Sequence, residues 1–219
     1  MQREAGGHKE ERRHVLILLP IPICLTKMSR EELIDKIAVH VREILKLVGE
    51  DPDRPDLRET PIRVAKALLE LTEGLRKEPP HVKFFKTGRK IESYVIVENI
   101  EFFSLCEHHL LPVIGYVSVA YKPEHDEVPG LSKVVRLVQW FSKRLILQER
   151  FTRELAEILL EKLKASSVYC KVFGLHLCTM LRGVRSRTSR LLTEAWAGEI
   201  TREELDMLRK LVKCKTLRI

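Results

Sequence analysis

The sequence has little of what builds fibrous, repetitive or disulfide-stapled proteins. Glycine and proline number 10 each among 219 residues, which excludes collagen-like and low-complexity architectures. Aromatic residues make up 6% and form no stripe of the kind that stacks nucleic-acid bases. The five cysteines are an odd number in a chain long enough to build its own core. We therefore expect buried or metal-binding thiols in a reducing cytoplasm rather than a disulfide framework.

Long apolar runs are also scarce. Residues 15–25, VLILLPIPICL, follow a basic stretch and resemble a signal peptide in outline. The run is too short to span a bilayer, holds two prolines and is not followed by a small-residue cleavage site. We expect residues 1–27 to be an N-terminal extension that is disordered or not native, and the protein to be cytoplasmic, without a membrane partner.

Charge, by contrast, is abundant and unbalanced. Charged residues make up 32% of the chain, and 39 Lys and Arg against 31 Asp and Glu give a net charge of +8. Together with 44% hydrophobic residues, this composition excludes a disordered acidic tail and a membrane bundle. The positive excess suits an anionic partner, which could be nucleic acid, a membrane surface or a phosphorylated small molecule.

Helical periodicity characterises the chain after residue 27. Ser29 and Glu32 have the spacing of a capping box ahead of apolar residues at helical intervals. Thr60 is expected to cap a second helix with Pro61 at its first position. These features predict a helical N-terminal lobe over residues 28–90.

From residue 91 the period changes. The order of predicted elements is strand, strand, helix, helix, strand, strand and a last helix capped by Thr201 and Glu204. The first six cover residues 94–103, 113–121, 131–147, 152–163, 168–174 and 191–197. This order indicates an α+β domain over residues 91–219, with one antiparallel sheet and helices on one face.

The most informative segment is SLCEHH at 104–109, between two predicted strands. Cys106 and His109 have the C-x₂-H spacing that lets a tight turn present both side chains to one ion. His176 and Cys178 follow another predicted strand, where alternate residues share a face. Cys106, His109 and Cys178 would supply three ligands, the pattern of a catalytic zinc with an open position for water. The alternative is a coincidental Cys–His pair and a buried, inert Cys178.

Two further groups suit a nucleotide. One group consists of a hydroxyl and cations near a predicted helix start, with one more cation after the second Cys–His pair. These residues are Ser132, Lys133, Arg136 and Arg182. These side chains would bind phosphate. The alternative is that the charged residues on the helix only solvate its polar face. Gln148 and Glu149 lie at a bend between predicted helices, where a carboxylate either caps the next helix or binds the donor edge of a purine. The pattern does not decide between these readings.

Taken together, the motifs resemble GTP cyclohydrolase I of the zinc-dependent type. They are ETPIRVAK at 59–66, SLCEHHLLP at 104–112, GLSK at 130–133, QER at 148–150, and HLC followed by RGV within 176–184. The resemblance runs in order from about residue 34 to residue 198. It departs at Thr179 and Leu181, where methionine is common, and at Arg190, in a stretch that is usually small and hydroxyl-rich.

The resemblance implies conversion of GTP and water to 7,8-dihydroneopterin triphosphate and formate, the first step of pterin biosynthesis. Cys106, His109 and Cys178 would hold zinc, which activates the water that attacks carbon 8 of guanine. His108 would donate a proton as the ring opens, and His176 would serve later proton transfers. Imidazole suits both roles because its ordinary pKa is about 6.5.

Substrate contacts follow from the same resemblance. Gln148 and Glu149 would bind the guanine edge, where a carboxylate accepts from ring N–H and exocyclic amine together and so rejects adenine. The triphosphate would be bound by Ser132, Lys133, Arg136 and Arg182, and, from a neighbouring subunit, by Arg63 and Lys66.

The fold implied is the tunnelling fold, in which sheets of several subunits join into a β-barrel. Closure of the ring removes open sheet edges, and the family forms homodecamers with active sites between subunits. The rivals are another tunnelling-fold pterin or deazapurine enzyme and a non-enzymatic, zinc-containing nucleic-acid-binding module. The module would want a fourth ligand and aromatic or arginine stripes, so we expect no nucleic-acid partner.

Overall fold

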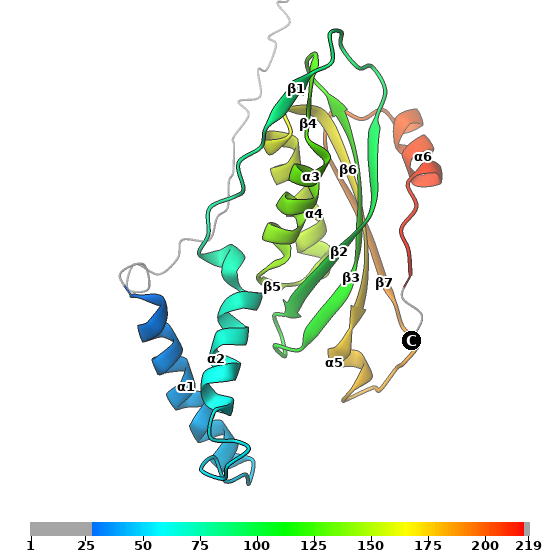
Figure 1. Cartoon of the computed structure of the whole chain (residues 1–219). Coiled ribbons are helices and arrows are strands. Elements are labelled where there is room, and N and C mark those ends of the chain that lie inside the picture. The colour runs from blue at the N-terminus through cyan, green and yellow to red at the C-terminus, as the bar shows by residue number, and fades with distance from the viewer. Residues whose placement is uncertain (1–27, 217–219) are drawn as a thin grey trace, which may run out of the picture.

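The computed structural model describes residues 28–216, so the extension predicted over residues 1–27 lies outside the described residues. A two-helix lobe projects from a sheet that carries helices on both faces (Figure 1). The lobe consists of α1 (Arg30–Leu47) and α2 (Thr60–Leu71). In the described part of the chain, no helix has the length and apolar character needed to cross a membrane.

The lobe follows from local sequence signals, with one exception. Ser29 Oγ accepts from the backbone N–H of Glu32, whose carboxylate accepts in return from the N–H of Ser29, which confirms the predicted capping box. Thr60, however, is the first residue of α2 rather than its cap, so that prediction is wrong. The preceding Glu59 already has helical φ and ψ, and its carbonyl accepts from Arg63 N–H, so the helix continues directly from the turn.

A five-stranded sheet forms the centre of the second part, in the order β5-β2-β3-β6-β7. All neighbours are antiparallel except β5, which runs parallel to the end of β2. The strands are β2 (Val95–Cys106), β3 (Pro112–Pro123), β5 (Leu145–Ile146), β6 (Ala165–His176) and β7 (Leu191–Gly198). Two strands of three residues each, β1 (Phe84–Lys86) and β4 (Glu127–Pro129), pair separately.

Helices cover both faces of the sheet, which corrects the prediction of a single helical layer (Figure 1). On β6, Val168 and Cys170 point into the main core, whereas Tyr169 between them packs with Leu208 on the other face. The main core lies under α3 (Leu131–Ser142) and α4 (Gln148–Lys162), and the opposite face is covered by α6 (Arg202–Leu211). The capping box of Thr201 and Glu204 at α6 is confirmed.

The predicted helix over 131–147 is too long, because β5 replaces its last turn. This change of direction brings the chain alongside β2, where Ile146 pairs with Cys106. It also anchors the lobe: Gly74, in the 3₁₀ turn after α2, donates its N–H to the carbonyl of Lys143 at 2.9 Å. A Cβ on Gly74 would lie 2.2 Å from the carbonyl oxygen of Trp140, so this close contact requires glycine.

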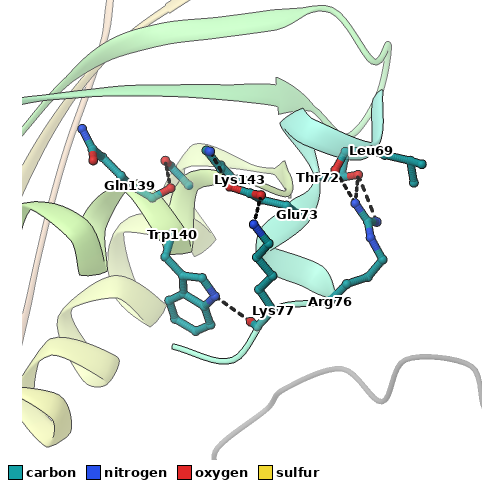
Figure 2. Close-up of polar contacts among 9 residues, drawn as sticks. Leu69, Thr72, Glu73, Arg76, Lys77, Gln139, Trp140 and Lys143 are labelled. Carbon is teal, nitrogen blue, oxygen red and sulfur yellow. Dashed lines mark hydrogen bonds and ion pairs between the residues drawn. The ribbon is translucent and has the colours of Figure 1, made fainter. Parts of the chain in front are cut away.

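Side chains reinforce the junction between lobe and sheet. The Glu73 carboxylate accepts from both Lys143 and Lys77, and Trp140 Nε1 donates to the carbonyl of Lys77 at 2.7 Å (Figure 2). A cavity of about 440 Å³ lies between this junction, α3 and β2, and Arg136 lines it. The lobe is therefore held in a defined orientation to the C-terminal end of α3.

Candidate metal centre and active site

Cys106 is the last residue of β2 and begins a tight turn into β3. Its N–H donates to the carbonyl of Leu111 at 2.8 Å, and its carbonyl accepts from Leu110 N–H at 2.9 Å. Leu110 has a φ of 54°, the left-handed conformation that closes the turn. Glu107 N–H donates to the carbonyl of Ile146 at 3.1 Å. The Cys106 turn (106–111) is thus fixed by backbone bonds on both sides.

The second Cys–His pair comes from the end of β6. His176 is the last residue of that strand, and Cys178 lies in the short helix α5 (Leu177–Met180), so the two do not share a strand face as predicted. They nevertheless meet the Cys106 turn. The Sγ atoms of Cys106 and Cys178 are 3.8 Å apart, and a ring nitrogen of His176 lies within 4.8 Å of both sulfurs.

This arrangement fits a zinc ion. Two thiolates bound tetrahedrally at about 2.3 Å from zinc are about 3.8 Å apart, which matches the separation of Cys106 and Cys178. Burial, and after it the proximity of Cys106, raises the pKa of the Cys178 thiol. A bound cation reverses that shift because it stabilises the thiolate. The donor set and its spacing are therefore those of a metal site.

The structure gathers His176, not His109, around the two sulfurs. His109 is exposed, and its Nε2 lies 3.2 Å from Nη1 of Arg182. The Nδ1 of His108 lies 3.9 Å from Cys106 Sγ. Both remain within the Cys106 turn, adjacent to the thiol pair, so the choice of third ligand stays a prediction.

The side chain of His176 contacts that of Gln148, the first residue of α4. The Oε1 atom of Gln148 lies 3.0 Å from Nε2 of His176, and the Gln148 side chain is fully buried. Burial lowers the pKa of His176, and the negative charge of the nearby Glu149 opposes this shift only in part. Glu149 itself is exposed in the first turn of α4, where its carboxylate is accessible to a ligand.

Comparison with known proteins shows the family of the chain. The sequence profile of the GTP cyclohydrolase I family matches residues 37–213, which include the whole sheet and the site. The chain belongs to the GTP cyclohydrolase I family.

Several GTP cyclohydrolases 1 are similar to this chain over most of their length. A GTP cyclohydrolase 1 of Pyrobaculum aerophilum is 52% identical over 161 residues, which cover 73% of this chain and 86% of the relative. The GTP cyclohydrolase 1 of Saccharolobus islandicus is 41% identical over 180 residues, which cover 79% of this chain and 86% of the relative. That of Sulfurisphaera tokodaii is 42% identical over 178 residues, which cover 78% of this chain and 86% of the relative.

The phosphate-binding residues predicted from the GTP cyclohydrolase I resemblance do not converge within one chain. Ser132 and Lys133 lie in the first turn of α3, whereas the thiol pair adjoins β5, beyond the far end of that helix. Arg63 is exposed on α2 and pairs with Glu59 at 2.5 Å. Lys66 is exposed on the same helix. Of the six predicted cationic and hydroxyl residues, Arg182 alone contacts the Cys106 turn in the described structure.

One ion pair at the site was not predicted. Glu107, which follows Cys106, pairs with Arg150, which follows Glu149 on α4. The pair thus links the Cys106 turn to the helix that carries the predicted guanine-binding carboxylate. Both residues lie within the motifs that carry the family resemblance, yet only the fold shows that they face each other.

Proposed function

We propose that this GTP cyclohydrolase I family enzyme hydrolyses GTP and rearranges it, with zinc, to 7,8-dihydroneopterin triphosphate and formate. This is the first step of pterin synthesis for folate, biopterin or deazaguanine products. The observation that carries the proposal is the buried thiol pair of Cys106 and Cys178, spaced for one zinc ion beside a histidine. A third protein ligand leaves one position of a tetrahedral ion open for water.

Cys106, Cys178 and His109 would hold the zinc, with His109 turned inward from its contact with Arg182. When bound, the ion supplies Lewis-acid activation of water for attack at carbon 8 of guanine. His108, which this ligand set leaves free, donates a proton to the imidazole nitrogen of guanine as the ring opens. His176, whose pKa is lowered by burial, accepts and returns protons in the later steps.

Charge accounts for substrate recognition. The exposed carboxylate of Glu149 accepts from the ring N–H and exocyclic amine of guanine, a donor pair that adenine lacks. The net charge of +8 complements the triphosphate. The residues proposed to bind the triphosphate are Ser132, Lys133, Arg136 and Arg182, with Arg63 and Lys66 from a neighbouring subunit.

The sheet supports assembly into a ring. Only the last two residues of β2, Leu105 and Cys106, pair with β5, which leaves the rest of its outer edge without a strand partner in the described chain. Open edges of this length favour pairing with another subunit. We propose that the sheets of the 91–219 domain join into the β-barrel of the tunnelling fold, within a cytoplasmic homodecamer whose 28–90 lobes reach neighbouring sites.

Incubation of the purified protein with GTP tests the proposed function. We expect formate and, after oxidation, a fluorescent pterin to form in equal amounts, and no product from ATP. Formation of a deazapurine or of a pterin from another precursor, without formate from GTP, would contradict the proposal.

A further inference from the structure

All the polar side-chain atoms of Gln148 have protein partners. Its Nε2 lies 3.2 Å from the carbonyl oxygens of both Val172 and Leu191, and 3.1 Å from Thr193 Oγ1. Its Oε1 lies 3.0 Å from His176 Nε2. The side chain has no exposed surface. Both hydrogens of the amide are therefore engaged inside the protein, which leaves none for a substrate.

These partners determine how the amide is turned. Backbone carbonyl oxygens only accept hydrogen bonds, so the nitrogen of the Gln148 amide must face Val172 and Leu191. The amide oxygen then faces His176, and it can only accept. Nε2 of His176 must therefore carry a hydrogen, and Nδ1 is the lone-pair nitrogen of the neutral ring.

We propose that Gln148 is a positioning residue that holds His176 in its Nε2–H tautomer, so that Nδ1 is the ring atom that exchanges protons. The inference rests on the proposed function, because it assigns His176 a part in the reaction. It gives Gln148 an indirect role in place of the guanine contact that the resemblance implies.

Gly174 provides the space for this contact. It lies on β6, two residues before His176, and pairs with Leu191 of β7. A Cβ at Gly174 would lie 2.0 Å from Oε1 of Gln148 and 3.0 Å from its Cδ. Any side chain there would displace the amide oxygen from His176. The sheet is therefore shaped around the amide as well as bonded to it.

A double-mutant cycle tests whether Gln148 acts through His176. Gln148→Met keeps an unbranched side chain of similar length but removes the acceptor that faces the ring. We expect it to lower kcat about 10- to 100-fold, the usual effect of losing the partner that orients a functional histidine, with KM for GTP little changed. In a His176→Ala background the same change should lower kcat no further.

Two variants control for damage to the fold. Thr152→Val removes a buried hydroxyl that bonds the Gln148 backbone carbonyl and Thr193 but does not touch the amide, so it should leave kcat nearly unchanged. Gly174→Ala displaces the amide without removing it, and should reproduce the loss caused by Gln148→Met only when His176 is present. It keeps the test available if Gln148→Met does not fold.

The outcomes distinguish failure of the positioning role of Gln148 from failure of the proposed function. Equal losses from Gln148→Met with and without His176, or a raised KM at unchanged kcat, would overturn the positioning role while wild-type activity upholds the proposed function. Absence of formate from GTP with the wild-type enzyme would contradict the proposed function itself.

The tautomer can also be observed without any reaction. Solid-state NMR of protein labelled with ¹³C,¹⁵N-histidine distinguishes the two neutral forms, and the His176 signals are those lost in His176→Ala. We expect the Nε2–H form in the wild type and a mixture in Gln148→Met. A wild-type ring in the Nδ1–H form would overturn the inference.

Discussion

The Sγ atoms of Cys106 and Cys178 lie 3.8 Å apart although β2 and β6 are not neighbours in the sheet. Strand β3 lies between them, and Val113 pairs with Ser104 on one side and with His176 on the other. Ser104 and His176 thus flank the same residue of β3, and each is followed two positions later by one of the cysteines. Cys106 lies at the start of its turn and Cys178 in α5. The register of three strands creates the thiol pair.

Loss of either thiol should remove the metal. Cys106→Ser and Cys178→Ser each take one thiolate from a three-ligand set, so we expect zinc content to fall to a small fraction of the wild-type value. Elemental analysis of the purified proteins measures this. Cys214→Ser is the matched control, because that thiol contacts the backbone of Tyr116 and should leave zinc content unchanged. Normal zinc in either site variant would contradict the assignment.

The histidines of the Cys106 turn should differ in effect. His109→Ala should lose zinc, because the C-x₂-H spacing nominates His109 as the third ligand. His108→Ala should keep zinc and bind GTP but react about 10²- to 10⁴-fold more slowly, the contribution of one general acid. Zinc content and single-turnover rates separate the two.

His176→Ala completes this comparison, since one of its ring nitrogens lies near both sulfurs. We expect it to retain zinc and to turn over GTP more slowly, at a rate that can still be measured. Loss of zinc in His176→Ala with normal zinc in His109→Ala would show that the ligand assignment is wrong. An unchanged oligomer size and melting curve would confirm that the variants fold.

Mixed oligomers should recover activity if neighbouring chains share a site. Arg63 is exposed on α2 and pairs with Glu59 of its own chain. We expect Arg63→Ala and Cys106→Ser to be inactive alone and partly active when co-expressed. Formate release from GTP measures the recovery. Co-expressed Cys106→Ser and Cys178→Ser, which damage the same part of the site, should recover nothing; equal recovery in both mixtures would contradict a shared site.

The junction between lobe and sheet should depend on pH. Hydrogen bonds from Lys143 and then Lys77 lower the pKa of Glu73. A carboxyl group whose pKa is lower in the folded state stabilises it above the ordinary pKa, and that stabilisation is lost as pH falls through the folded-state value. Glu73→Gln should therefore cost about 1 kcal/mol or less near pH 7. The difference from wild type should shrink as pH falls below the ordinary carboxyl pKa and vanish below the lowered folded-state pKa of Glu73. A difference that persists at low pH, measured by denaturant unfolding, would contradict this account.

Local signals predicted the fold best. The capping boxes at Ser29 and Thr201 involve residues three apart, and both form as predicted. The long strands were predicted because their periodicity extends over many residues. The short strands β1, β4 and β5 were missed, since two or three residues carry no period and each is held only by pairing with a distant segment.

In the candidate site, too, local spacing was informative, whereas contacts between distant segments could not be predicted. Spacing singled out Cys106 and Cys178, which the structure brings together. The burial of Gln148 and the space left by Gly174 were not predicted, because they depend on how α4 packs against β6 and β7. Sequence patterns record which side chains are present, whereas the contacts between them arise from strand register and helix packing.

Zinc titration of metal-stripped protein tests the central claim most directly. The stripped enzyme is mixed with increasing zinc, and bound metal and formate released from GTP are measured in the same samples. We predict that activity returns in proportion to bound zinc and reaches its limit at one ion per thiol pair, with no recovery in Cys178→Ser. Full conversion of GTP to formate by protein verified to hold no metal would contradict the account.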